Sequence, residues 1–364
     1  MDAKLFSNRS FSLSGTRLFV FLTLGLSVSA LILDWLAGRS LNQGASLTVP
    51  FWVSALATAG VGYWAVPLLR SLKAGQVIRE DGPQSHLKKA GTPTMGGAFF
   101  VPVAILLAIM LSGFSINVMA VSALTMGYAA IGFFDDWQII RYKSNKGISP
   151  RLKMGLQIAL AIAFCVWMLV TQPATITNLA LPFGLALPLG GLFWLLAGFV
   201  LVAESNATNL TDGMDGLAGG TVAIALLGLG AVVGGNSPDL MIFCACLSGG
   251  CLGFLVHNRN PARVFMGDTG SLALGGALAA VALISNSLFA LLILSGLFVI
   301  ETLSVIAQVA YYKATKDSNG VGKRLFKMSP FHNHLELTGW TETQVVGWFY
   351  AIATILAVLT FTVR

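Results

Sequence analysis

Residues 116–137 read INVMAVSALTMGYAAIGFFDDW, a run of nineteen mostly apolar residues followed by two adjacent aspartates and a tryptophan. About 17–25 apolar residues suffice to cross the hydrocarbon core of a bilayer as a helix. Only helices and closed barrels satisfy their backbone groups in lipid, and barrel strands would alternate over about ten residues. The stretch therefore predicts a membrane-spanning helix that ends in two carboxyl groups.

The same apolar pattern recurs along the whole chain. Of its 364 residues, 55% are hydrophobic and only 10% are charged, against about 25% charged in soluble domains. We predict an all-α, polytopic transmembrane bundle of about 10–11 spanning helices. The expected spans are 17–37, 48–70, 96–114, 116–134, 152–171, 188–204, 217–235, 240–257, 271–285, 287–313 and 343–362. The segments 271–285 and 287–313 could also form one long broken helix.

The net charge of +7 is a topology signal and gives no reason to expect nucleic-acid binding. Lys and Arg gather in the loops 70–95, 135–153, 258–270 and 313–342 and before residue 17, which eleven spans place on one side. Basic short loops stay in the cytoplasm, so the N-terminus is predicted inside and the C-terminus outside. The four cysteines lie in apolar runs and are interpreted as packing residues.

Three acidic clusters stand at predicted cytoplasmic span ends, where ionisable groups are candidates for function. Asp135-Asp136 would repel each other unless a cation relieves them. The stretch 206–216, NATNLTDGMDG, offers carboxylates and amides that suit a hard cation or a ribose. Asp268 sits at a helix start, a favourable place for phosphate. A solvated helix end, an Asn/Asp/Gly turn and an ordinary N-cap are the structural alternatives.

Two further polar clusters are expected at the same face. The stretch 91–97, GTPTMGG, follows Lys88 and Lys89, and its backbone N–H groups could approach an anion; a plain turn before a helix would look the same. His332 and His334 would share one face only in an extended segment. We expect these histidines to contact phosphate or sugar and not a metal, although surface histidines without a role are the alternative.

Convergence of all five clusters on one face favours a single active site built from cytoplasmic loops. Carboxylates with Mg²⁺, together with lysines and glycine loops, indicate phosphoryl transfer, in which positioning and charge neutralisation dominate. A site at the lipid boundary implies that one substrate is a lipid. The sequence therefore predicts an enzyme of phosphoryl chemistry that uses Mg²⁺ and acts on a lipid substrate.

Several of these motifs closely resemble the phospho-N-acetylmuramoyl-pentapeptide transferases. The resemblance covers roughly residues 50–364 and rests on motifs in the family's order: 79–86 (REDGPQSH) with Lys88 and 91–97, Asp135-Asp136, 209–216 (NLTDGMDG), 265–268 (FMGD) and 323–327 (KRLFK). It implies attack of undecaprenyl phosphate on UDP-N-acetylmuramoyl-pentapeptide, with lipid I and UMP as products. It also implies a bacterial inner-membrane enzyme of peptidoglycan synthesis that faces the cytoplasm, and a homodimer.

The resemblance also implies residue roles. Asp268 would ligate Mg²⁺, with Asp135 as a second candidate ligand and as base or positioning group for the lipid phosphate, and Asp136 and His332 would complete the catalytic set. The implied substrate-binding residues are Lys88, Asn209, Asp212, Asp215, Asn258, Phe265, which would stack on uracil, and His334. Direct attack and a covalent aspartyl intermediate both stay open.

This chain departs from the family in two places. Asn333 stands where the family usually has the middle of three histidines. The apolar segment 17–37 adds a span to the family's ten, so residues 1–47 are expected to form a cytoplasmic segment and an extra anchor before a phosphoglycosyl transferase domain at 48–364.

Two rival functions remain. A related enzyme using UDP-N-acetylglucosamine would differ in the histidine loop and in the first cytoplasmic loop. An ion-coupled transporter could use Glu301, alone in a long span, as its coupling group. A transporter predicts acids spread through the membrane depth, whereas these acids gather at one face, and Glu301 is expected to pair within the bundle.

Overall fold

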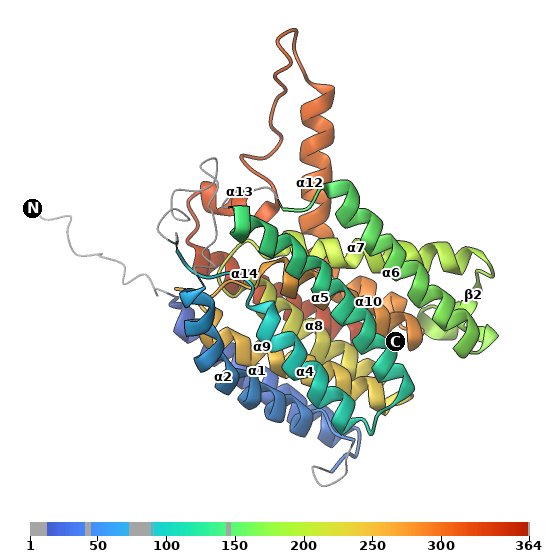
Figure 1. Cartoon of the computed structure of the whole chain (residues 1–364). Coiled ribbons are helices and arrows are strands. Elements are labelled where there is room, and N and C mark those ends of the chain that lie inside the picture. The colour runs from blue at the N-terminus through green and yellow to red at the C-terminus, as the bar shows by residue number, and fades with distance from the viewer. Residues whose placement is uncertain (1–12, 41–44, 73–88, 90, 143–146, 363–364) are drawn as a thin grey trace, which may run out of the picture.

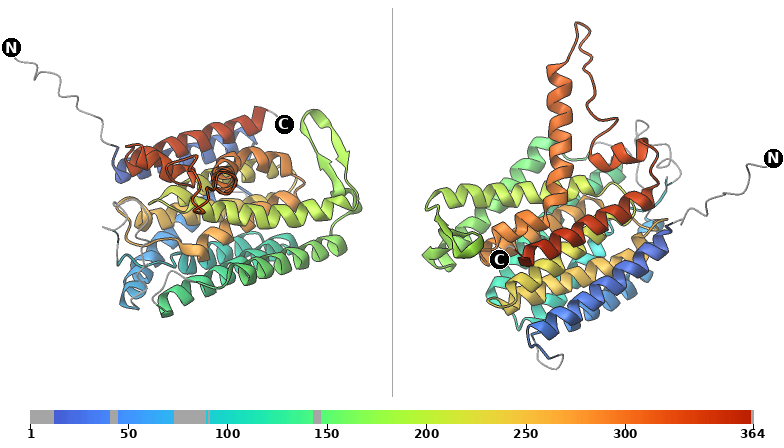
Figure 2. Two further views of the ribbon diagram at one scale, coloured as in Figure 1. Left: turned by 90° about the horizontal axis from the view of Figure 1, so that it is seen from above. Right: turned by 180° about the vertical axis from the view of Figure 1, so that it is seen from behind.

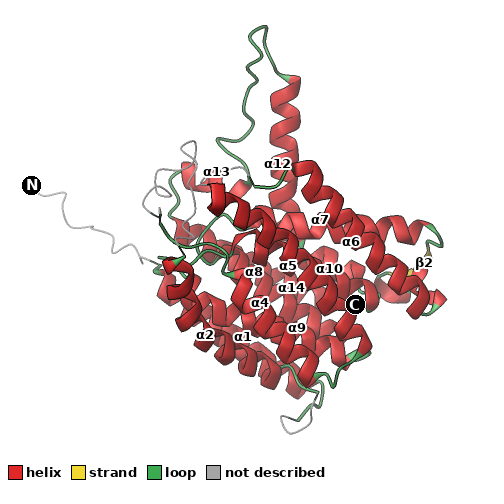
Figure 3. Ribbon diagram, in the orientation of Figure 1, coloured by secondary structure: helices red, strands yellow, loops and turns green. Residues whose placement is uncertain are grey.

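The computed structural model describes residues 13–40, 45–72, 89, 91–142 and 147–362, and these are mostly helical (Figures 1 and 3). The long helices are α1 (Gly15–Leu36), α2 (Thr48–Ser71), α4 (Gly97–Leu111), α5 (Ile116–Tyr142), α6 (Pro150–Thr171), α7 (Leu192–Thr211), α8 (Leu217–Val233), α9 (Pro238–Asn258), α10 (Gly267–Ile284), α12 (Gly296–Ala314) and α14 (Glu342–Thr362). The short elements are the 3₁₀ turns Ala174–Thr177 and Pro182–Gly184, strands β1 (Asn178–Ala180) and β2 (Ala186–Pro188), α11 (Leu288–Leu294) and α13 (Phe331–Leu337).

The helices lie side by side in one bundle (Figure 2). Among the eight helices long and apolar enough to cross a membrane, α9 and α10 are the most enclosed: 94% of the apolar window of α9 and 89% of that of α10 are buried, against 28% for α1, α2, α6 and α12. Large apolar side chains such as Leu195 and Phe199 are instead exposed on the outer helices. Exposed apolar surface on this scale suits lipid and not water. The predicted all-α polytopic bundle is therefore confirmed.

Every predicted span corresponds to helix, with one change of shape. Eight helices in the described chain are long and apolar enough to cross a membrane, and α4 and α8 are shorter apolar helices. The segment 287–313, predicted as one span, is broken at Ser295 into α11 and α12. Asn286, with φ of 51°, separates α11 from α10. Beyond the break α12 leaves the bundle and projects from it (Figure 1).

Small residues allow the central helices to pack closely. A side chain at Gly249 would come within 2.0 Å of the Phe51 carbonyl oxygen, and one at Gly253 within 2.4 Å of the Ala55 carbonyl oxygen. Close backbone approach between spanning helices is the usual role of small residues at four-residue spacing. This face of α9 therefore holds α2 against the bundle.

Helix α1 packs on the same bundle as the remaining helices, with contacts to α2, α8, α9 and α14. The side chain of Asp34, near its end, accepts hydrogen bonds from the backbone N–H groups of Leu47 and Thr48, at 2.9 Å each. At its other end Gly15 lies against Asn260, in the loop before α10. The additional apolar segment is thus an integral helix of the bundle.

Candidate active site

The aspartate pair lies inside helix α5 and not at its end. We expected a span ending at residue 134, but α5 continues to Tyr142 because residues 135–142 keep bonding within the helix. Both carboxyl groups are buried. They therefore sit where α5 passes neighbouring helices, and the interpretation as a solvated helix end is wrong.

Asp136 binds the start of helix α10. Its carboxyl oxygens accept hydrogen bonds from the backbone N–H of Asp268 at 3.2 Å, from the N–H of Thr269 at 3.0 Å and from the Thr269 hydroxyl at 2.7 Å. A carboxylate at a helix N-terminus satisfies donors that the helix itself leaves unpaired. Asp136 thereby fixes the direction in which Asp268 projects.

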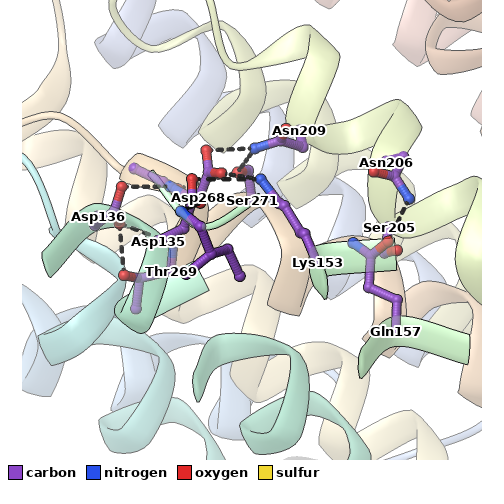
Figure 4. A network of polar contacts seen from close by, with 12 residues as sticks. Asp135, Asp136, Lys153, Gln157, Ser205, Asn206, Asn209, Asp268, Thr269 and Ser271 are labelled. Atoms are coloured by element: carbon purple, nitrogen blue, oxygen red, sulfur yellow. Dashed lines mark hydrogen bonds and ion pairs between the residues drawn. The ribbon is translucent and has the colours of Figure 1, made fainter. Parts of the chain in front are cut away.

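Lys153 of α6 joins the other two carboxyl groups (Figure 4). Its Nζ atom forms ion pairs with Asp268 and, at 3.6 Å, with the Oδ2 atom of Asp135. Asn209 of α7 donates from Nδ2 to Asp268 at 2.7 Å and to the Ser271 hydroxyl at 2.9 Å. Four helices thus meet around Asp268, and its side chain keeps 25% exposure on the open side.

Two backbone contacts set the spacing of these helices. A side chain at Gly132 would come within 2.2 Å of the Asp268 carbonyl group, and one at Gly97 within 2.2 Å of the Gly270 nitrogen. Real Cβ atoms do not approach other atoms so closely. The start of α10 is consequently clamped between the backbones of α4 and α5.

The turn between α7 and α8 brings the second acidic cluster to the same place. Helix α7 ends at Thr211, and Gly216, with φ of 80°, is the N-cap residue of α8, so the stretch between them is a turn. Burial, reinforced by the nearby Asp268 and Asp136, raises the pKa of Asp212 to about 8. Several carboxyl groups thus lie close together near Asp212 with few cationic side chains among them. Their mutual repulsion favours the binding of an additional cation.

A second network surrounds Asp215. Its carboxyl group pairs with Lys89 at 2.7 Å and accepts from Asn260 at 3.1 Å and from the Ala262 N–H at 3.0 Å. Glu342, at the start of α14, pairs with the same lysine at 2.6 Å. Burial alone would lower the pKa of Lys89, but the two acids raise it above its usual value. Lys89 therefore stays charged where the segments that carry Asp215, Asn260 and Glu342 meet.

The loop before α10 is tied to the stretch 91–97. Asn258 accepts from the Gly216 N–H at 3.0 Å and donates to the Val264 carbonyl at 2.8 Å. The N–H groups of Gly96 and Gly97 donate to the carbonyls of Phe265 and Met266. Those two N–H groups are therefore not available to an anion, which favours the alternative of a plain turn for this end of the stretch 91–97.

The histidine segment is a short helix, so its two histidines diverge. His332 is 1% exposed, and its Nδ1 atom lies 2.9 Å from the carboxyl group of Glu301, which also accepts from the His332 backbone N–H at 3.2 Å. His334 instead accepts a bond from the Lys327 N–H. The extended conformation needed for a shared face is absent, whereas the expected pairing of Glu301 is confirmed.

His332 also reaches the acidic turn. A side chain at Gly213 would meet the His332 Nε2 atom at 2.1 Å, so the ring packs directly on this glycine. Within the described chain, Nε2 has no hydrogen-bond partner. Glu301, His332 and Gly213 therefore connect α12, α13 and the α7–α8 turn.

Sequence reasoning missed Lys153 and Glu342 as site residues, and it named Lys89 beside the stretch 91–97 without its acidic partners. Lys153 was counted as a topology charge, and its distance from the acids along the chain hid the pairing. Lys88, which was expected to bind substrate, lies outside the described residues. Asn206, at the start of the second cluster, bonds Gln157 at 2.9 Å and stands aside from Asp268 (Figure 4).

The donor set suits a magnesium ion that the substrate helps to bind. Across the residues that the structure describes, no group of three or more His, Cys, Asp or Glu side chains is arranged to enclose a metal. Mg²⁺ commonly binds one or two carboxylates and completes its shell with water and substrate phosphates. The partly exposed Asp268, beside Asp135, fits this kind of site.

Comparisons with known proteins identify the family of the chain. Residues 118–286 match the family described as glycosyl transferase family 4, and residues 89–101 match signature 1 of the phospho-N-acetylmuramoyl-pentapeptide-transferases. Proteins named phospho-N-acetylmuramoyl-pentapeptide-transferase are 68% identical in Trichormus variabilis and 67% identical in a Nostoc species, each over 99% of this chain and 98% of the relative. One from Gloeothece citriformis is 61% identical over the full length of both.

Proposed function

Because the chain belongs to the phospho-N-acetylmuramoyl-pentapeptide-transferase family, we propose that it transfers phospho-N-acetylmuramoyl-pentapeptide from its UDP derivative to undecaprenyl phosphate. The observation that supports this most strongly is the meeting of Asp135, Asp136 and Asp268 with Lys153 at one end of an apolar bundle. Charged groups at such a boundary suit a reaction between a water-soluble diphosphate and a lipid phosphate.

The reaction exchanges one phosphoanhydride bond for another. An oxygen of the lipid phosphate bonds to the β-phosphorus of the nucleotide sugar, and the bond from that phosphorus to the α-phosphate oxygen breaks. UMP leaves with the electron pair, and the lipid carries a diphosphate-linked sugar, lipid I. Developing negative charge is best stabilised by cationic groups already in place. Lys153 is such a group, and Asp135 lies 3.6 Å from it to orient the attacking phosphate.

We propose Mg²⁺ as cofactor, held by Asp268 with Asp135 as the second candidate ligand. When bound, the ion would neutralise phosphate charge. Asp136 would act through the backbone of α10, since its oxygens already bind the Asp268 and Thr269 N–H groups. Asn209 would keep the Asp268 side chain directed toward the open side.

The nucleotide is proposed to bind on the neighbouring network. Asp212, Asp215 and Phe265 lie on the two loops that this network ties together, and Asn258 is the last residue of α9 beside them. Lys89 adds a partly buried cation there, and the predicted contact of Phe265 with uracil remains a proposal. The proposed location is the bacterial inner membrane with the site facing the cytoplasm; the homodimer also stays a prediction.

The test is an assay of purified protein with undecaprenyl phosphate, Mg²⁺ and either UDP-N-acetylmuramoyl-pentapeptide or UDP-N-acetylglucosamine. We expect UMP and a lipid product only with the first sugar, no product after chelation of divalent ions, and none from Asp268→Asn. Normal activity of that variant would exclude the proposed role of Asp268. Product from UDP-N-acetylglucosamine would instead favour the rival enzyme.

A transporter is the less well supported alternative. Its proposed coupling residue, Glu301, is fully buried and bonded to His332, which packs on the acidic turn. The residue is therefore part of the site's framework. Proton-driven uptake without lipid product would nevertheless overturn the transferase proposal.

A further inference from the structure

A second cavity, separate from the acidic site, opens between α2 and α9. Its volume is about 400 Å³. The lining residues are Gly62, Tyr63, Val66, Pro67, Arg70, Ser71, His257 and Arg263. Among the residues that the structure describes, the lining includes two arginines and no carboxyl group, and none of the residues around Asp268 belongs to it. Its charge therefore calls for an anion, and the transferase reaction does not account for it.

One of the two arginines is held in place by the protein itself. Arg263 donates from one nitrogen to the Val256 carbonyl at 3.1 Å and to His257 Nδ1 at 3.2 Å. A guanidinium group can only donate, so Nδ1 of His257 must accept and its Nε2 carries the proton. That Nε2 group then donates to the Ala59 carbonyl of α2 at 3.0 Å.

The close passage of His257 across α2 depends on a glycine. A Cβ atom at Gly62 would lie 2.3 Å from the imidazole Nε2 atom, so only glycine leaves room for the ring. The ring of Tyr63 contacts the same imidazole edge to face, with centroids 4.9 Å apart. The contacts of His257 with Gly62 and Arg263 thus fix the position of Arg263 at the cavity. A mobile arginine on the surface would lack such contacts.

The second arginine stands at the level of lipid headgroups. Helix α2 has 24 residues and is about 36 Å long, somewhat more than the hydrocarbon core of about 30 Å. Arg70 lies in its last turn and is exposed. Near it, Trp64 and Leu68 are 85% and 60% exposed, as expected on a lipid-facing surface with an aromatic residue near the interface.

We propose that this cavity binds the headgroup of an anionic membrane lipid. The headgroup phosphate would lie between Arg70 and Arg263, while the acyl chains run along the exposed apolar face of α2. Basic pockets between spanning helices suit such headgroups. A lipid is the better occupant than a free anion because the cavity lies beside that apolar face. The proposal does not depend on the transferase reaction.

The test measures lipid binding to the purified full-length protein in detergent, with phosphatidylglycerol and phosphatidylcholine of matched chains. Each arginine near a membrane surface contributes about fivefold in affinity, so Arg70→Gln with Arg263→Gln should weaken phosphatidylglycerol binding about 25-fold. Binding of phosphatidylcholine should not change. The single variant Arg70→Gln, at an exposed position, should bind phosphatidylglycerol about fivefold more weakly than the wild type.

The matched control is Arg141→Gln with Lys313→Gln, which removes two charges outside the cavity and should leave binding within twofold of wild type. Equal unfolding temperatures in phosphatidylcholine establish that each variant is folded. Unchanged phosphatidylglycerol binding by the double arginine variant, or an equal loss in the control, would refute the site. Saturation by inorganic phosphate that excludes the lipid would refute the assignment to a lipid.

Discussion

Replacing Glu301 by alanine should destabilise the protein strongly, although the residue lies inside an apolar helix. The carboxyl group accepts from the His332 ring at 2.9 Å and from its backbone N–H at 3.2 Å. Both residues are buried, so water cannot replace the lost acceptor. The variant leaves two buried donors unpaired in a helix that also packs on the acidic turn.

The size of the effect follows from those two donors. A buried donor left without its partner costs about 1–3 kcal/mol, so two cost about 2–6 kcal/mol. At roughly 2 °C per kcal/mol for domains above 150 residues, the unfolding temperature should fall by roughly 4–12 °C. The unfolding temperature of Glu301→Gln should lie between those of the wild type and Glu301→Ala. The side-chain carbonyl of the glutamine can keep one of the two hydrogen bonds. Its amide group would donate to Nδ1 of His332 and so force the imidazole proton onto Nε2, against Gly213.

A thiol-reactive dye can follow this unfolding. Cys244, Cys246 and Cys251 are free and buried, so they react only when the bundle opens. Leu303→Ala is the control, since Leu303 is two residues away on the same helix and 55% exposed. It should shift stability by less than about 0.5 kcal/mol. Equal unfolding temperatures for Glu301→Ala and this control would refute the reasoning.

Three further predictions concern the site itself. Lys153→Met should lower kcat for UMP release by about 10²–10³, because a preplaced charge is lost beside Asp268; an unchanged rate would exclude its proposed role. Asp212 has a raised pKa of about 8, so it holds a proton in the folded state that the unfolded chain has released. The metal-free protein should therefore lose stability between pH 4 and 8, as thermal unfolding would measure, and Asp212→Asn should flatten this slope. Gly132→Ala should abolish most activity in the same assay by displacing the start of α10, whereas Gly155→Ala, whose Cβ atom would meet nothing within 4 Å, should be neutral; equal activities would show that the contact at Gly132 is unimportant.

The sequence allowed most of the architecture to be predicted, because apolar length is a direct consequence of bilayer thickness. The sequence also predicted that the acidic clusters lie on the same side of the membrane, because the basic loops indicate which ends of the spans face the cytoplasm. The break at Ser295 was not predictable, because the residues on both sides of it are equally apolar. Hydropathy indicates whether a segment lies in lipid or in water, and it does not indicate the direction of the helix axis.

The sequence predicted the acids of the site but did not reveal the role of Lys153. Asp268 and Asp135 are rare polar residues beside apolar runs, whereas Lys153 is one of many basic loop residues. Its pairing depends on how α6 is placed against α5 and α10, which no spacing in the chain reveals. The partner of Glu301 was hidden for the same reason, since 31 residues separate it from His332.

The clamp around α10 has a consequence for how this enzyme tolerates change. Gly97 and Gly132 touch no proposed substrate, yet each keeps a neighbouring backbone within van der Waals range of the helix that carries Asp268. An added methyl group there would lie 2.2 Å from the backbone of α10, well inside ordinary contact, so it would displace Asp268 while removing no core side chain. Random mutagenesis should therefore yield folded but inactive variants with substitutions at these two glycines. Because glycine has no functional side chain, its residue type alone would not mark these positions as important.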